Sequence, residues 1–208
     1  MTFDDGPGVY THYALNKLAA AHEHATFFDV GRSVDNWPGY LTRKLKVGAV
    51  EDHTYTHGAL IALAPGQITY QLQATAAKIQ TQTGEAVQLW RPPYGLHNPT
   101  VDRIAQQLGL LDVLWDVDSQ DSLGANYAQI IRNVEAGLRP GAIIEMHENR
   151  GQTIRALTAL LPALHRRHLR SVTVPQLLAS DPPSVKQVRN GLAGCKREGE
   201  VLTHGAPR

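Results

Sequence analysis

Short apolar runs rich in β-branched and aromatic residues alternate with helical patterns along most of this 208-residue chain. Such alternation is typical of βα units, in which parallel strands are covered by helices. The runs that predict strands are ATFFDV (25–30), VQLW (87–90), DVLWDV (112–117), AIIEM (142–146) and SVTV (171–174). Helical patterns cover residues 11–23, 38–46, 64–83, 99–108, 127–138 and 153–167. About six such units favour one closed or nearly closed α/β barrel over two domains.

The pattern changes after Leu178. Asp181-Pro182-Pro183 interrupts it, and residues 194–208 are polar and contain glycine. We therefore expect one domain over residues 1–180 and an irregular, partly ordered tail over residues 181–208.

Composition excludes several classes of function. Lys and Arg number 20 against 19 Asp and Glu, and no block of like charge occurs, so nothing favours a nucleic acid or a membrane surface as partner. The single cysteine, Cys195, cannot form an intramolecular disulfide. No apolar run approaches a membrane span, and residues 1–5 do not resemble a signal peptide, so localisation is unknown from the chain itself. The hydrophobic share of 42% is enough for a substantial core.

Two short motifs carry possible chemistry. His53 and His57 are four residues apart, a separation of about 6 Å along one face if the segment is helical, so both could bind one cation. Asp4 and Asp5 are adjacent, and side chains of adjacent residues point in different directions. One carboxylate could complete a His-His-Asp metal site while the other acts as a base. Taken singly, the histidines could equally pack independently, and Asp5-Gly6-Pro7 could be a simple turn.

Five motifs in order resemble the polysaccharide deacetylase family, the NodB homology domain of carbohydrate esterase family four. They are TFDDGP (2–7), HTYTH (53–57), RPPYG (91–95), WDVDSQD (115–121) and Met146-His147 after an apolar run. The resemblance covers Thr2 to His147 and continues through the closing segment 172–175, which is most of the chain. It implies a distorted (β/α) barrel with fewer than eight units, a divalent metal ion, and hydrolytic removal of acetyl groups from a polysaccharide.

The resemblance also implies roles for individual residues. Asp5, His53 and His57 match the metal ligands, with Zn²⁺ expected first and Co²⁺ as an alternative. Asp4 matches the catalytic base and Arg91 the residue that orients it. His147 matches the catalytic acid and Asp121 the carboxylate that tunes it, while the backbone N–H of Tyr94 matches an oxyanion donor. Acetylated polysaccharides or oligosaccharides are the implied partners, and secretion or cell-wall association is the implied location.

The sequence departs from the family in five places, one of which is Asp52, where asparagine or serine is common. Glu145 replaces a leucine and Ser122 a tryptophan, and both family residues line the pocket for the acetyl methyl group. Glu51 stands where glycine is usual. Only Met1 precedes Thr2, so we expect a shortened first strand.

Strand alternation places Glu145 on the same face as His147, pointing into the barrel. A carboxylate there requires a partner such as His147, Arg91 or the metal site; without one its pKa rises and it is protonated. With Ser122, this predicts a wider and more polar acyl pocket, with weak acetyl turnover or another acyl group as substrate. Alternatively, a neighbouring loop fills the gap and a local hydrogen bond holds Glu145.

Three functions remain open at this stage. The first is a metal-dependent deacetylase acting on peptidoglycan, chitin-type oligomers or acetylxylan. The second is a carbohydrate-binding pseudoenzyme, and the third is a metal-dependent amidase or esterase of another acyl substrate. Retention of the acid, the base and the metal residues argues against the second, because a binding module needs no general acid.

The other histidines and two tyrosines have no motif support. We expect them to be surface or packing residues: His12, His22, His24, His97, His165, His168, His204, Tyr70 and Tyr127.

Overall fold

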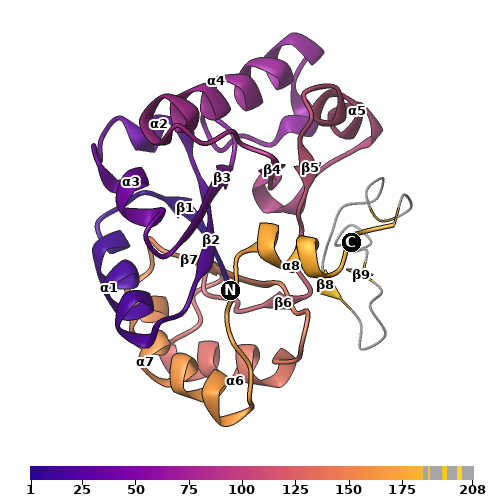
Figure 1. The fold of residues 1–208 in the computed structure, drawn as a ribbon. Coiled ribbons are helices and arrows are strands. Elements are labelled where there is room, and N and C mark those ends of the chain that lie inside the picture. Colours follow the sequence, from indigo (N-terminus) through magenta and orange to yellow (C-terminus); the bar gives the residue numbers. More distant parts are fainter. Residues whose placement is uncertain (185–186, 188–193, 196–200, 203–208) are drawn as a thin grey trace.

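The computed structural model describes residues 1–184, 187, 194–195 and 201–202. Seven parallel strands form one sheet in the order β5-β4-β3-β2-β1-β7-β6. The strands are β1 (Thr2–Gly6), β2 (Ala25–Asp29), β3 (Gly48–Asp52), β4 (Leu89–Trp90), β5 (Leu111–Asp112), β6 (Val117–Asp118) and β7 (Ile144–His147). Figure 1 shows the sheet curled, with most helices on its outside. The predicted distorted (β/α) barrel with fewer than eight units is confirmed.

Helices follow all the strands of the sheet except β5. They are α1 (Thr11–Ala21), α2 (Gly31–Val34), α3 (Tyr40–Lys44), α4 (Pro65–Thr83), α5 (Pro99–Gln107), α6 (Tyr127–Gly137), α7 (Gly151–Arg166) and α8 (Val174–Ser180), with single 3₁₀ turns η1 (Leu60–Ala62) and η2 (Pro93–Gly95). Side chains of Asn98, Asn126 and Thr173 accept hydrogen bonds from the first backbone N–H groups of α5, α6 and α8, which fixes where these helices begin. In the described part of the chain, no helix has the length and apolar character to cross a membrane.

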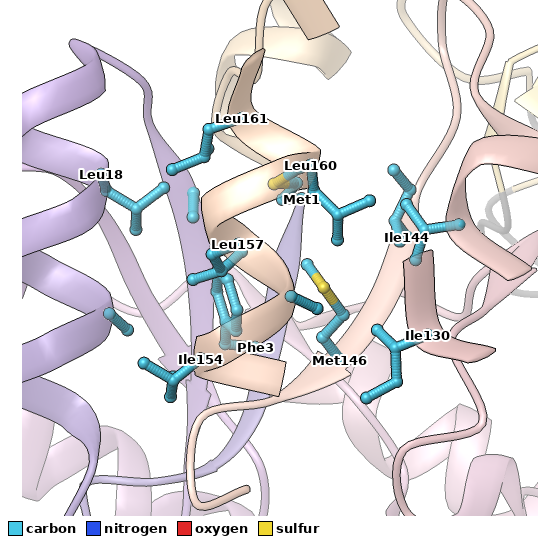
Figure 2. Close-up of a cluster of buried hydrophobic side chains, with 14 of the residues drawn as sticks. Met1, Phe3, Leu18, Ile130, Ile144, Met146, Ile154, Leu157, Leu160 and Leu161 are labelled. Carbon is cyan, nitrogen blue, oxygen red and sulfur yellow. The ribbon is translucent and has the colours of Figure 1, made fainter. Parts of the chain in front are cut away.

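The largest hydrophobic cluster lies between the sheet and the outer helices. Figure 2 shows Phe3 of β1 and Met146 of β7 against the leucines of α7, with Leu18 and Ile130 contributed by α1 and α6. Phe3 and Met146 are fully buried. Because strand side chains alternate, their neighbours in β1 and β7 point to the opposite, inner face of the sheet. The outer packing therefore determines which side chains enter the barrel.

A smaller cluster occupies the inside of the barrel. Phe28 of β2 packs there with Leu89, Val113 and Ile143, and Val174 at the start of α8 joins them. Its neighbour Phe27 belongs to the outer cluster, as the alternation requires. Helix α8 thus covers one end of the barrel interior.

The strand predicted over residues 112–117 is wrong. Two short strands, β5 and β6, lie at opposite edges of the sheet, and residues 113–116 connect them. The backbone carbonyls of Val113 and Leu114 accept hydrogen bonds from the side chain of Arg91. These carbonyls therefore pair with a buried guanidinium group instead of a neighbouring strand.

The strand predicted over residues 171–174 is also wrong. The N–H of Val174 donates to the hydroxyl of Thr26 at 2.8 Å, and the N–H of Ser171 donates to the carboxylate of Glu23. Thr173 then caps α8. Side-chain acceptors have replaced strand pairing in this segment.

Several boundaries differ from those predicted. Residues 48–52, which were not predicted as a strand, form one of five residues, and the short helix α2 was not expected. β1 has five residues because it continues through both carboxylates to Gly6, so it has the length of an ordinary strand. β7 includes His147 instead of ending before it. Most of the predicted tail, and His204, lie outside the described residues.

Candidate active site

Parallel pairing of β1 and β7 brings two candidate catalytic residues together. Asp4 is the register partner of His147, and Thr2 is the partner of Glu145. All four are buried, between 1% and 7% exposed. Their side chains share the inner face of the sheet, since the alternate residues Phe3 and Met146 face the outer helices.

Asp5 is turned away from this row by an irregularity in β1. Its φ is 67°, and the pairing with β2 shifts register between Asp4 and Gly6. As a result its Oδ1 lies 3.0 Å from Nε2 of His57 and 3.6 Å from Nε2 of His53. The two adjacent aspartates therefore have different neighbours, as the sequence predicted.

The two histidines do not lie on a helix, so the helical spacing considered for them is wrong. Residues 53–57 form a loop after β3, with positive φ at Thr54 (65°) and His57 (60°). Backbone N–H groups of Tyr55 and Thr56 donate to Oε1 of Gln71 on α4 at 3.0 and 2.9 Å. The loop brings the ring centres of His53 and His57 to 4.8 Å from each other.

The ring orientation of His53 is fixed by its other nitrogen. Nδ1 lies 2.8 Å from the carbonyl oxygen of Arg91. When Nδ1 carries the proton and donates it to this oxygen, Nε2 keeps a free lone pair that faces Asp5. Burial lowers the pKa of His53, although Asp4 and Asp5 oppose the shift. A neutral ring with Nε2 directed at the carboxylate is the form that binds a metal ion.

Asp5, His53 and His57 fit a divalent ion. One oxygen of Asp5, Oδ1, is buried and accepts no well-aligned hydrogen bond among the described residues. Burial alone would raise the pKa of Asp5, but His57, His53 and His147 lower it well below the ordinary value, so the group is a carboxylate. Two imidazoles and one carboxylate leave coordination positions open for water or substrate, as in catalytic zinc sites.

Arg91 orients Asp4. Its Nη1 donates to Oδ1 of Asp4 and to the hydroxyl of Thr2, both at 2.7 Å, and the guanidinium group is fully buried. The other oxygen of Asp4, Oδ2, lies 3.9 Å from Nε2 of His53. One oxygen is thus held by arginine while the other faces the candidate metal ligands.

Asp121 holds His147 at two points. Its Oδ1 lies 2.7 Å from Nδ1 of the ring, and its Oδ2 accepts the backbone N–H of His147 at 2.7 Å. Burial lowers the pKa of His147, but the hydrogen bond and charge of Asp121, with the charge of Asp4 adding to them, raise it to about 9. The histidine is therefore protonated near neutral pH, and Nε2 lies 4.0 Å from Oδ2 of Asp5.

Of the remaining candidate residues, some lie beside the catalytic candidates and others are exposed. Glu145 clusters with Asp4 and His147, whereas Ser122 is exposed on the turn that follows Asp121. Tyr94 has a φ of 62° and is 60% exposed, and its ring packs 4.9 Å from that of His57. The oxyanion role of its N–H stays a prediction.

Besides Gln71, two further supporting residues were not predicted. Thr153, in the first turn of α7, donates to Asp121, and the side-chain amide of Asn149 donates to Oδ2 of Asp5 at 3.4 Å. Both follow His147 within six residues, so a search for polar side chains at the next helix start could have found them. Glu51, the departure from glycine, accepts the N–H groups of Gln88 and Leu89, and burial raises its pKa to about 7.

Comparison with known proteins identifies the family. The sequence profile of the family described as polysaccharide deacetylase matches residues 1–113. The chain is 33% identical to a chitooligosaccharide deacetylase of Bradyrhizobium sp., over 85% of this chain and 89% of that protein. The chain belongs to the polysaccharide deacetylase family. A bifunctional xylanase/xylan deacetylase of Cellvibrio japonicus is 38% identical over 71% of this chain, which spans only 22% of that larger protein.

Solved structures share the fold of this polysaccharide deacetylase family member. A structure described as T48 deacetylase with substrate has a TM-score of 0.81 and 36% identity, covering 86% of this chain and 89% of that one. A family 4 acetyl xylan esterase from Clostridium thermocellum with a cobalt ion has a TM-score of 0.81 and 28% identity, with coverage of 86% and 89%. A neighbour with a TM-score of 0.80 and 28% identity, covering 85% of this chain and 65% of that one, is described as a family pseudoenzyme. The fold alone therefore does not establish turnover.

Proposed function

We propose that the chain hydrolyses acetyl groups on a polysaccharide that contains N-acetylglucosamine, with one divalent ion held by Asp5, His53 and His57. One observation carries the proposal: two oriented pairs, Asp4 with Arg91 and His147 with Asp121, flank these three residues. Both Asp4 and His147 place a side-chain atom within 4.0 Å of one of the three. Similarity to a chitooligosaccharide deacetylase supports an N-linked acetyl group.

A divalent ion in this position would polarise the scissile carbonyl group and lower the pKa of an attacking water molecule. Asp4 accepts a proton from that water through its free oxygen, while Arg91 holds the other oxygen. His147, protonated at neutral pH, donates a proton to the nitrogen of the departing sugar amine. Water is consumed, the C–N bond breaks, and acetate and an amine are released.

The test is acetate release by the zinc-loaded chain from three substrates: chitin oligomers, peptidoglycan fragments and acetylxylan. We expect release from one or both glucosamine polymers and its loss after chelation. The Asp4→Asn chain should still bind zinc but lose about 10²- to 10⁴-fold in activity, because it lacks the base. His57→Ala should lose both zinc at this site and activity.

Other outcomes would overturn the proposal. Release from acetylxylan alone would contradict the N-acetyl substrate, and unchanged release after chelation would contradict the metal site. If the chain bound chitin oligomers but released no acetate from any of the three, the pseudoenzyme alternative would replace it. Glu145 and Ser122, which depart from the residues of the family, are the reason to test the pseudoenzyme alternative.

A further inference from the structure

A second cluster of metal-binding side chains lies apart from the candidate active site. It consists of His97, which follows η2, Asp102 in the first turn of α5, and Asp112 at the end of β5. One ligand atom from each lies within 4.8 Å of the others. These residues come from three elements, so folding brings them together. The sequence analysis assigned His97 to the surface or to packing.

The spacing of the donor atoms matches that of a metal site. Nδ1 of His97 lies 2.9 Å from Oδ1 of Asp102 and 3.5 Å from Oδ2 of Asp112. Two donors each about 2.1 Å from one ion are about 3.0 Å apart at an octahedral angle and about 3.4 Å apart at a tetrahedral one. The corresponding distances from Asp5 to His57 and His53 are 3.0 and 3.6 Å. The two clusters are therefore alike in geometry.

Asp112 gives an independent reason to expect a cation. It is 7% exposed, and neither of its carboxylate oxygens accepts a hydrogen bond among the described residues. Oδ2 is directed at the histidine of the cluster. A buried carboxylate without hydrogen bonds is costly, and a bound cation removes the cost by coordination.

Arg91 does not take this role. Arg91 lies close enough to affect Asp112 electrostatically, but its donors are directed at Asp4, Thr2 and the carbonyls of Val113 and Leu114. His97 carries one donor at Nδ1, which also faces Asp102 at the shorter distance. Within the described part of the chain, the two oxygens of Asp112 thus lack a donor that could satisfy both.

We propose that His97, Asp102 and Asp112 bind a second divalent transition-metal ion. One imidazole nitrogen and two carboxylate oxygens suit Zn²⁺ and Mn²⁺ better than a thiol-seeking ion such as Cu⁺. The side chains of His97 and Asp102 are 12% and 17% exposed, so an ion can enter from solvent and water can complete its coordination. This site is independent of the proposed hydrolysis.

The position of the cluster indicates a structural role. An ion there would join the segment after η2 to α5 and to the edge strand β5. The same segment follows Tyr94, whose ring packs against His57 of the candidate active site. The second ion would therefore stabilise the loop beside the candidate active site without contacting the substrate.

The decisive measurement is zinc stoichiometry, using the full chain without a histidine tag, stripped by chelator and dialysed against ZnCl₂. We expect two equivalents for the wild type, one for His57→Ala, one for His97→Ala, and none for the double variant. His24→Ala, which removes an exposed histidine outside both clusters, is the matched control and should keep two equivalents. Asp112→Asn, close in shape to the native residue, should match His97→Ala and serves if that variant does not fold.

A second readout does not depend on activity. In the His57→Ala background, zinc at a hundredfold excess over its dissociation constant should raise Tm by roughly 5–10 °C, and His97→Ala should abolish that rise. One equivalent in the wild type would overturn the second site. The second site would also be overturned if His97→Ala and Asp112→Asn both bound as much zinc as the wild type. If the wild-type chain bound two equivalents of zinc but hydrolysed none of the substrates, that result would contradict the proposed function and leave the second site standing.

Discussion

The contact between Asp121 and His147 sets how the enzyme should respond to pH. Burial lowers the pKa of His147, but Asp121 raises it more, and the result is about 9. The histidine donates a proton only while it is protonated. Activity should therefore persist as pH rises until the histidine loses its proton.

Asp121→Asn should lower the pKa of His147, because it removes the negative charge beside Nδ1. The basic limb of the pH profile of kcat/KM should consequently move to lower pH, by about one unit or more. Glu85→Gln removes an exposed carboxylate far from the ring and should leave the limb in place. An unchanged limb in Asp121→Asn would remove Asp121 from the mechanism.

Glu145 stands where the family resemblance predicts a leucine. Burial, with Asp4 adding to it, raises its pKa to about 9, so the carboxyl group is protonated at neutral pH. Among the described residues no hydrogen bond reaches its carboxyl group, which lies with the side chains of Asp4 and His147. A protonated carboxyl group beside the reacting atoms suits a polar acyl group better than a methyl group.

Restoring the family residues should therefore favour acetyl turnover. Glu145→Leu combined with Ser122→Trp should raise kcat/KM for acetate release from an acetylated oligosaccharide by roughly tenfold, the effect of an added apolar contact. Glu145→Gln, which keeps a polar group of the same size, is the control and should not show the gain. Unchanged or lower release in the double variant would refute the altered pocket.

At the scale of elements, hydrophobic periodicity predicted the helices and strands whose positions depend on local sequence. Strands β2, β4 and β7 and helices α1 and α4 to α7 were expected near their observed positions, because apolar spacing and caps such as Asn98 and Asn126 are local signals. The five motifs also selected the site residues that the fold brings together. Residues 113–116 and 171–174 could not be predicted, because their backbone groups pair with Arg91, Glu23 and Thr26 from distant parts of the chain.

Lys44 shows the same limit in a short helix. It ends α3, and its side chain is fully buried between the carboxylates of Asp29 and Glu148. Asp29 ends β2 and Glu148 follows β7, so one ammonium group joins three elements. No local pattern reveals such a contact.

Lys44→Met should leave both carboxylates buried without their cation. We expect the free energy of unfolding, measured in urea, to fall by about 3–5 kcal/mol. Arg43→Met, on the same helix, removes an exposed guanidinium group that lies over Tyr40 and should cost at most about 1 kcal/mol. Equal losses in the two variants would show that the buried ammonium group is not what stabilises this junction.

At the scale of the whole molecule, Arg91 links the barrel to Asp4, the proposed base. Strands β5 and β6 are consecutive in the chain but lie at opposite edges of the sheet, so the segment between them closes the inside. Arg91 donates to two carbonyls of that segment and to Asp4 on β1, and its guanidinium group stacks 4.2 Å from the ring of Phe28. One side chain therefore donates hydrogen bonds to the closing segment and orients Asp4.

Removing Arg91 should accordingly impair both stability and turnover. Arg91→Met leaves Asp4 and the two carbonyls buried without donors, and should lower the free energy of unfolding by about 3–5 kcal/mol as well as reduce kcat/KM. Arg91→Lys keeps the charge but not the planar set of donors, so it should restore little of either. Asp4→Asn separates the two effects, because it should reduce turnover as strongly while costing less stability. If Arg91→Met unfolded at the wild-type urea concentration, Arg91 would act through Asp4 alone, and the closing segment would be held by its own packing.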